Sequence, residues 1–252
     1  MSSPVFTTTS EGFAHASLTY DVVPVRAVIE SPLITPVDAL RRLRTEGESS
    51  FISESVSSEI GASRYSYVCP SVENIIRTGK SEFLGDVNPL SNLRSQFANR
   101  NVAPLDELPA LVTGAFGFVS YEAVRHFEPS VGELPSDPTE SPVSAMAIPS
   151  ELLVFDNALN QLHIIVFASK SQSFESAQTR ISQIAESLAE PTPSEISRET
   201  SRSPQFETAP EPSSPKRTQY TEMVRQAREA IIDGELIQVV LGQRVTIETK
   251  AD

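Results

Sequence analysis

The chain contains several short segments in which apolar positions alternate with polar ones or run together, bounded by Gly, Pro, Asn, Asp or Ser. This pattern is typical of β-strands. It predicts strands over residues 18–29, 50–56, 64–69, 111–121, 151–155 and 161–168. Pro24 interrupts the first of them and indicates a sheet edge or a bulge, because proline cannot donate a hydrogen bond to a neighbouring strand.

Other segments repeat their apolar residues at three- and four-residue spacing, as one face of a helix does. Thr35 followed by Pro36 is typical of a helix start, with Thr35 as the capping residue and Gly47 as the stop. Helices are predicted over residues 36–44, 89–97, 122–127, 174–188 and 219–233. Thr218 is the expected cap of the last helix, Gly234 ends it, and residues 236–247 (LIQVVLGQRVTI) read as a final strand.

Short connections join the strand at 50–56 to that at 64–69, and the strand at 151–155 to that at 161–168. Such connections make hairpins, which pair antiparallel strands. The sequence therefore predicts an α+β fold with an antiparallel β-sheet or sandwich body and packed helices, and not a doubly wound parallel sheet.

The composition changes once, at residues 191–217, which hold six Pro and six Ser. Such a segment buries too little apolar surface to offset its ordering entropy, so we expect an extended linker, with an ordered surface loop as the alternative. It divides a flexible N-terminus (1–17) and an α+β domain (18–190) from residues 218–252. One helix and one strand cannot bury each other's apolar faces. The last strand therefore either joins the sheet of the first domain or belongs to a domain that is incomplete here.

Charge and composition exclude several classes of protein. With 20 Lys and Arg against 33 Asp and Glu, the net charge of −13 disfavours nucleic acid and anionic membranes as partners. One Cys among 252 residues excludes a disulfide framework, and three isolated His residues give no metal cluster. No apolar run is long enough to span a membrane, and the N-terminus does not resemble a secretory signal. We expect a soluble, cytoplasmic protein.

Some conspicuous residues are predicted to be structural. Gly114 and Gly117 suggest a close approach of the backbone. They do not indicate a phosphate loop, because no Lys-Ser/Thr follows them. His163, like the other histidines, is expected to pack or to face solvent. Cys69 is expected to pack as a small apolar side chain.

Five segments carry motifs: LITPVDALRRL (33–43), SFISESVSSEIGASRYSY (50–67), GAFGFVSYEAVRHFE (114–128), ELLVFD (151–156) and YTEMVRQAREAIIDGELIQVVLGQR (220–244). In this order they resemble the motifs of anthranilate synthase component I, a family of chorismate-using enzymes. The last motif is the most specific of them.

The resemblance implies the N-terminal portion of such a subunit: a tryptophan-sensing α+β domain, a linker, and the first helix and strand of the chorismate-binding domain. The complete enzyme of the family converts chorismate and ammonia to anthranilate and pyruvate with Mg²⁺, the ammonia coming from a glutamine amidotransferase subunit. The family's chorismate and magnesium motifs are not found in this sequence. We therefore expect no cofactor in this chain and no catalysis by it alone.

Glu54 and Ser55 stand where the family has the Glu-Ser of its feedback tryptophan site. By this resemblance Ser55 supplies a hydroxyl and Glu54 a charge or a supporting contact, while Arg64, Tyr65 and Ser66 on the paired strand help to close the pocket. An amino-acid ligand needs such polar groups and an apolar slot for its indole. The alternative is a half-exposed edge strand with no ligand.

Gln238 stands where relatives that add water to chorismate have a Lys base. Glutamine cannot accept a proton at neutral pH, which agrees with ammonia as the nucleophile. The alternative is an outward-facing polar residue of a strand. Val239 and Val240 resemble the anthranilate-forming branch more than the aminobenzoate-forming branch.

Two other functions remain open at this point. One is a non-enzymatic module that binds tryptophan and pairs with a separate catalytic half. The other is a fragment similar to aminodeoxychorismate synthase component I.

Overall fold

The structure, a computed structural model, describes residues 3–54, 64–98, 100–132, 140–190 and 215–243. The chain forms two compact units, residues 1–191 and residues 192–252. The linker expected at 191–217 lies outside the described residues except for its last three. The first domain expected at residues 18–190 stays a prediction.

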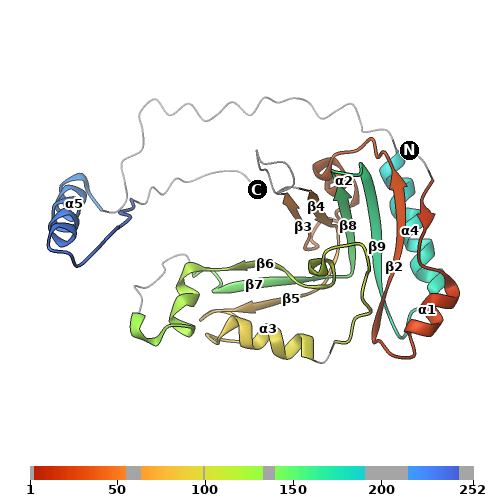
Figure 1. Cartoon of the computed structure of the whole chain (residues 1–252), viewed down its shortest axis with the longest axis horizontal. Coiled ribbons are helices and arrows are strands. Elements are labelled where there is room, and N and C mark those ends of the chain that lie inside the picture. The colour runs from red at the N-terminus through yellow and green to blue at the C-terminus, as the bar shows by residue number, and fades with distance from the viewer. Residues whose placement is uncertain (1–2, 55–63, 99, 133–139, 191–214, 244–252) are drawn as a thin grey trace. The chain divides into compact units, whose positions relative to one another are not determined.

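A six-stranded sheet forms the centre of the first unit (Figure 1). Its strands, in spatial order, are β1 (Val5–Phe6), β2 (Val22–Glu30), β9 (Gln161–Ser169), β8 (Glu151–Asp156), β4 (Tyr65–Cys69) and β3 (Phe51–Glu54). All neighbours pair antiparallel. The hairpin of β8 and β9 lies in the middle of the sheet, and its apolar runs are buried because both faces of the sheet are covered.

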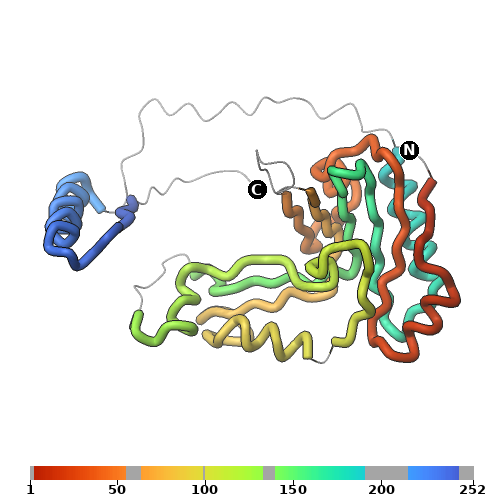
Figure 2. The backbone as a smooth tube through the Cα atoms, viewed as in Figure 1, coloured from red at the N-terminus to blue at the C-terminus, as the bar shows by residue number. Residues whose placement is uncertain are grey.

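A three-stranded antiparallel sheet is inserted between β4 and β8, with the order β5 (Val72–Thr78), β7 (Ser144–Pro149) and β6 (Phe116–Val119). Figure 2 shows the chain leaving the larger sheet, passing through the smaller one and returning. Helix α3 (Pro89–Ala98) lies along β5. The described residues between β5 and β7 also form three 3₁₀ helices: η1 (Ala110–Thr113), η2 (Tyr121–His126) and η3 (Pro129–Val131).

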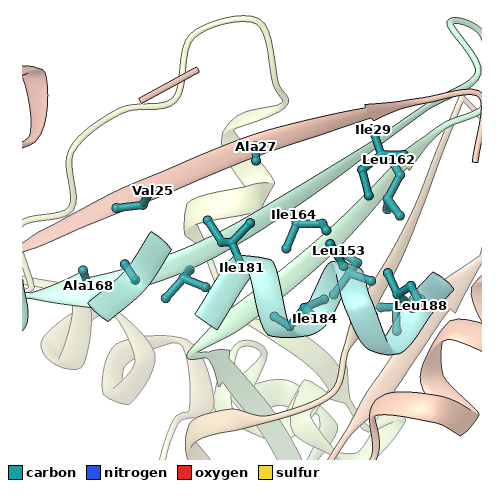
Figure 3. Packing of buried hydrophobic residues seen from close by; sticks show 14 of the residues in the cluster. Val25, Ala27, Ile29, Leu153, Leu162, Ile164, Ala168, Ile181, Ile184 and Leu188 are labelled. Carbon is teal, nitrogen blue, oxygen red and sulfur yellow. The ribbon is translucent and has the colours of Figure 1, made fainter. Parts of the chain in front are cut away.

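Three helices cover one face of the six-stranded sheet: α1 (Ser10–Ala16), α2 (Pro36–Leu43) and α4 (Phe174–Ala189). Ile181, Ile184 and Leu188 of α4 are buried against β2, β8 and β9, which supply Ala27, Leu153, Ile164 and their neighbours (Figure 3). The helix therefore forms because its apolar stripe has a sheet face on which to pack.

The opposite face of the same sheet carries a second apolar cluster with Val154, Ile165 and Phe167. Leu105 and Leu108, from the segment before η1, pack against it. Arg26 in β2 holds this segment: its guanidinium donates to the Asp106 carbonyl and pairs with Glu107.

The second unit is described only in part. Helix α5 (Arg217–Ile232) ends before Gly234, which has a left-handed φ of 78° as expected. Residues 236–243 form no strand, so the predicted strand at 236–247 is wrong over the part that the structure describes. A lone segment has no neighbouring strand to satisfy its backbone hydrogen bonds, and none is present among the described residues of this unit.

The antiparallel α+β class is confirmed, and so are both hairpins and the helices α2, α3 and α4. Thr35 caps α2 as predicted, accepting a hydrogen bond from the Asp38 backbone. Pro24 lies in β2 and pairs with β9 on one side. On the other side the two-residue β1 does not extend as far as Pro24, so Pro24 has an edge position. The close approach of the backbone predicted at Gly117 is also present. A Cβ atom at Gly117 would collide with the backbone of Ala145 in the paired strand β7.

Other sequence predictions were wrong or incomplete. The strand expected at 111–121 is shorter, because η1 occupies its first residues and only Phe116–Val119 pairs with β7. The cap of α5 is Lys216 and not Thr218. The N-terminal residues expected to be flexible include β1 and α1, whose Phe13 is buried. The strands β5 and β7 were missed.

Candidate functional site

The β3–β4 hairpin separates its residues onto two faces of the sheet. Glu54 lies directly opposite Ser66, and Ser53 lies directly opposite Tyr67. Because directly opposed residues share a face and neighbours along a strand alternate, Glu54 and Ser66 lie on the face that α2 and α4 cover, and Ser53 and Tyr67 lie on the other. Glu54 is exposed, whereas Ser66 is buried.

Arg64, just before β4, pairs with Asp156 at the end of β8. Its Nε lies 3.0 and 3.1 Å from the two carboxylate oxygens, and its Nη2 lies 2.6 Å from Oδ2. The guanidinium carbon lies 4.8 Å from the centre of the Tyr65 ring, a cation–π distance. Tyr65 is directly opposite Asp156 in the sheet, so these three side chains gather on the face of Tyr67.

Asp156 also closes the turn of the β8–β9 hairpin. Its Oδ1 accepts hydrogen bonds from the backbone N–H groups of Ala158 and Leu159. Burial alone would raise the pKa of this carboxyl group, but the bonds from Arg64 and from the turn hold the pKa below its usual value. Asp156 is therefore an ionised, fully bonded group, with a side chain only 2% exposed.

Aromatic side chains continue this face toward the smaller sheet. Phe51 stacks on Phe116 at 4.8 Å between ring centres, Tyr67 lies 5.3 Å from Phe116, and Tyr65 lies 6.4 Å from Tyr67. Tyr67 and Phe116 are buried, while Tyr65 remains half-buried at the edge of the cluster. Of these rings, only Phe51 and Tyr65 are partly exposed, and Tyr65 lies beside the Arg64 guanidinium.

The structure brings together some of the residues predicted to bind a ligand. Arg64 and Tyr65 are in contact, whereas Glu54 and Ser66 lie on the opposite face, so the four described residues do not line a single surface. Ser55 lies outside the described residues. Gln238 is exposed in the second unit. Sequence reasoning missed Asp156 as a partner of Arg64, although ELLVFD was noted as a motif.

A cleft of about 630 Å³ lies elsewhere in the first unit, near the start of α4. Glu151 and Arg180 line it and form an ion pair with two bonds of 2.7 Å. None of the residues predicted to bind a ligand lines this cleft, so its size alone does not make it the functional site.

His163 is a buried residue that the sequence marked only as structural. It is 6% exposed in β9, and neither ring nitrogen has a hydrogen-bond partner among the described residues. Burial lowers the pKa of His163, and the positive charge of Arg26 lowers it further, although Asp156, Glu107 and Glu30 act in the opposite direction. The folded chain therefore favours the neutral imidazole.

This burial predicts a loss of stability in acid. The unfolded histidine has a pKa of about 6.5, so protons bind the unfolded chain more readily and stability falls as the pH drops below that value. Urea unfolding between about pH 7 and about pH 5 should show a shallower decline for His163→Leu than for the parent chain, by about 1 kcal/mol. The matched control is His15→Leu, at an exposed site on α1. Equal declines in the two variants would contradict this role of His163.

Cys69 is buried, and burial raises the pKa of its thiol to about 12, so it packs as an unreactive side chain. In the described parts of the chain, no three His, Cys, Asp or Glu residues come close enough to hold a metal ion. Those parts also contain no helix with the length and hydropathy needed to cross a membrane.

Comparison with known proteins identifies the family. The model of the chorismate binding enzyme family matches residues 54–252. The chain belongs to this family of chorismate binding enzymes. The matched range includes Arg64, Tyr65, Asp156 and Gln238.

Curated relatives confirm the resemblance seen in the motifs. Anthranilate synthase component 1 of Streptomyces coelicolor is 32% identical over 240 residues, covering 92% of this chain and 45% of the relative. Anthranilate synthase component 1 of Pseudomonas putida is 29% identical and covers 94% of this chain and 50% of the relative. The chain thus spans about half the length of the relatives that it matches.

The fold has a solved counterpart. The crystal structure of anthranilate synthase component I from Streptococcus pneumoniae superposes with a TM-score of 0.53 at 23% identity. The match covers 82% of this chain and 45% of that one. At this identity the comparison supports the fold alone.

Proposed function

We propose that this chain is part of an anthranilate synthase component I and that its first unit senses L-tryptophan. The observation that carries the proposal is the similarity to component I over 92% of the chain. The complete enzyme would act in the cytoplasm on chorismate and ammonia, with a glutamine amidotransferase subunit as its partner, to give anthranilate and pyruvate.

The chemistry of the Arg64 face supports an aromatic amino acid as the ligand. An indole packs well on aromatic rings, and Tyr65 leaves part of its ring accessible beside the buried cluster. A carboxylate is bound best by a guanidinium, and Arg64 has one nitrogen, Nη1, that is not used by Asp156. Ser55 is proposed to add a hydroxyl. Glu54 and Ser66, on the opposite face, would act only by supporting the hairpin.

The chorismate chemistry of the complete enzyme is assigned to few residues of this chain. Gln238 is proposed as the position that favours ammonia over water, because its amide is not a base. Mg²⁺ is proposed for the complete enzyme. The described residues provide no set of ligands that fits the ion, so we derive no step through it.

The alternatives gain no support from the relatives, which are named as anthranilate synthase component 1. Neither a non-enzymatic tryptophan-binding module nor an aminodeoxychorismate synthase fragment is therefore preferred.

Titration with L-tryptophan tests the sensing function. The chain has no Trp of its own, so the fluorescence of the ligand can be followed without background. We expect saturable binding in the micromolar range, and at a hundredfold excess over Kd a stabilisation of about 2.7 kcal/mol against unfolding. D-Tryptophan is the control ligand. Absence of both saturation and thermal stabilisation would show that this chain does not sense tryptophan.

A further inference from the structure

The Asp156 carboxylate serves two partners at once. It pairs with Arg64 through the two-pronged contact described above, and it accepts the two backbone hydrogen bonds that close the β8–β9 turn. The turn is also joined to the start of β4, because the Asn157 N–H donates to the Arg64 carbonyl at 2.8 Å. The backbone and the side chain of Arg64 are therefore both fixed by the same hairpin.

An arginine in this position would otherwise be free to adopt many conformations. Its side chain is 41% exposed, and a long exposed side chain loses much rotamer freedom when it binds a ligand. Asp156 has already restricted Nε and Nη2, and the guanidinium lies over the Tyr65 ring. A ligand that binds Nη1 would meet a group whose orientation is already set.

We propose that Asp156 is a positioning residue, which holds the Arg64 guanidinium over Tyr65 so that it receives the carboxylate of an aromatic amino acid. The inference rests on the proposed sensing function and deepens it. Asp156 does not contact the ligand in this proposal. It acts by lowering the entropy that Arg64 loses on binding.

The other end of β8 supplies a matched control. Glu151 is also buried, with a side chain 6% exposed, and it also forms a two-bond ion pair with a half-exposed arginine, Arg180. Glu151 lies on the face covered by α4. Side chains alternate along β8, so Glu151 shares this face with Leu153, while Asp156 lies on the opposite face. Its loss should affect stability without affecting the face of Tyr65.

The experiment compares Asp156→Asn with Glu151→Gln in the full chain. Asparagine keeps the Oδ1 that closes the turn but removes the charge that holds Arg64. By titration with L-tryptophan, we expect affinity about tenfold weaker in Asp156→Asn and unchanged in Glu151→Gln. Both variants should lower the melting temperature. If only Asp156→Asn also binds more weakly, a simple loss of stability does not explain the change in affinity.

A readout without ligand completes the test. Proton exchange at the Arg64 Nε–H, followed by NMR, should be slow in the parent chain and in Glu151→Gln and fast in Asp156→Asn. Parental affinity or slow exchange in Asp156→Asn would overturn the positioning role while leaving the sensing function intact. An equal loss of affinity in both variants would also overturn it. Absence of binding by the parent chain would instead refute the sensing function, and with it the role of Asp156 in ligand binding.

Discussion

Replacing Leu162 by alanine is expected to lower the free energy of unfolding of the first unit by about 2–5 kcal/mol. Leu162 is fully buried in β9, the second strand of the central hairpin, and it belongs to the cluster that α4 covers (Figure 3). Its neighbours come from β2, β8 and α4 and cannot all move to fill the space that the side chain would leave. The transfer energy of the lost carbons and the energy of the cavity therefore add. Chemical denaturation followed by circular dichroism measures the change.

Leu159→Ala removes the same atoms three residues earlier, in the turn of the same hairpin. Leu159 is 57% exposed, so its loss creates no cavity, and we expect a change within about 0.5 kcal/mol. A comparable loss in the two variants would mean that the cluster around Leu162 is not the stabilising core.

Gly117→Ala is expected to cost about 3 kcal/mol or more, at the upper end of what overpacking causes. A Cβ atom at Gly117 would collide with the Ala145 carbonyl oxygen, and it would lie 2.9 Å from the Met146 Cα. Both contacts are with backbone, which cannot rotate away as a side chain can. The pairing of β6 with β7 should therefore open. Amide hydrogen exchange should show faster exchange in these two strands, and a thermal melt should show the lower stability.

Gly242→Ala is the control for the glycine substitution. A Cβ at Gly242 would meet no atom within 4 Å, so the change should leave the melting temperature unaltered. Unaltered stability and amide exchange in Gly117→Ala as well would contradict the close approach of β6 and β7.

The sequence predicted the elements whose pattern is local. The β8–β9 hairpin has long apolar runs on both sides of a polar turn, and α2 has Thr35 and Pro36 at its start. The strand β5 was missed because Glu73, Asn74 and Arg77 interrupt its apolar residues. These side chains are exposed, so the strand lacks the continuous burial that reveals a central strand. The strand predicted after α5 had the right composition, but a strand also requires a partner, which composition does not supply.

The candidate site was predicted less completely than the fold. The motif around residue 54 directed attention to the β3–β4 hairpin, where the structure places Ser53 and Glu54 on opposite faces of the sheet. The role of Arg64 depends on Asp156, which lies 92 residues away in sequence. No local pattern relates two such residues, because only the order of strands in the sheet makes β4 and β8 neighbours.

The order of strands also has a consequence for synthesis on the ribosome. In the six-stranded sheet, β2 and β4 are made early, yet β8 and β9 lie between them. When synthesis has reached β7, the strands β2 and β4 are complete. Their neighbours in the centre of the sheet, β9 and β8, have not yet been made. The sheet can be completed only after β9 has left the ribosome, so its folding should be delayed and dominated by contacts between distant residues. Until then the edges of β2 and β4 that pair with β9 and β8 in the finished sheet have no partner strand.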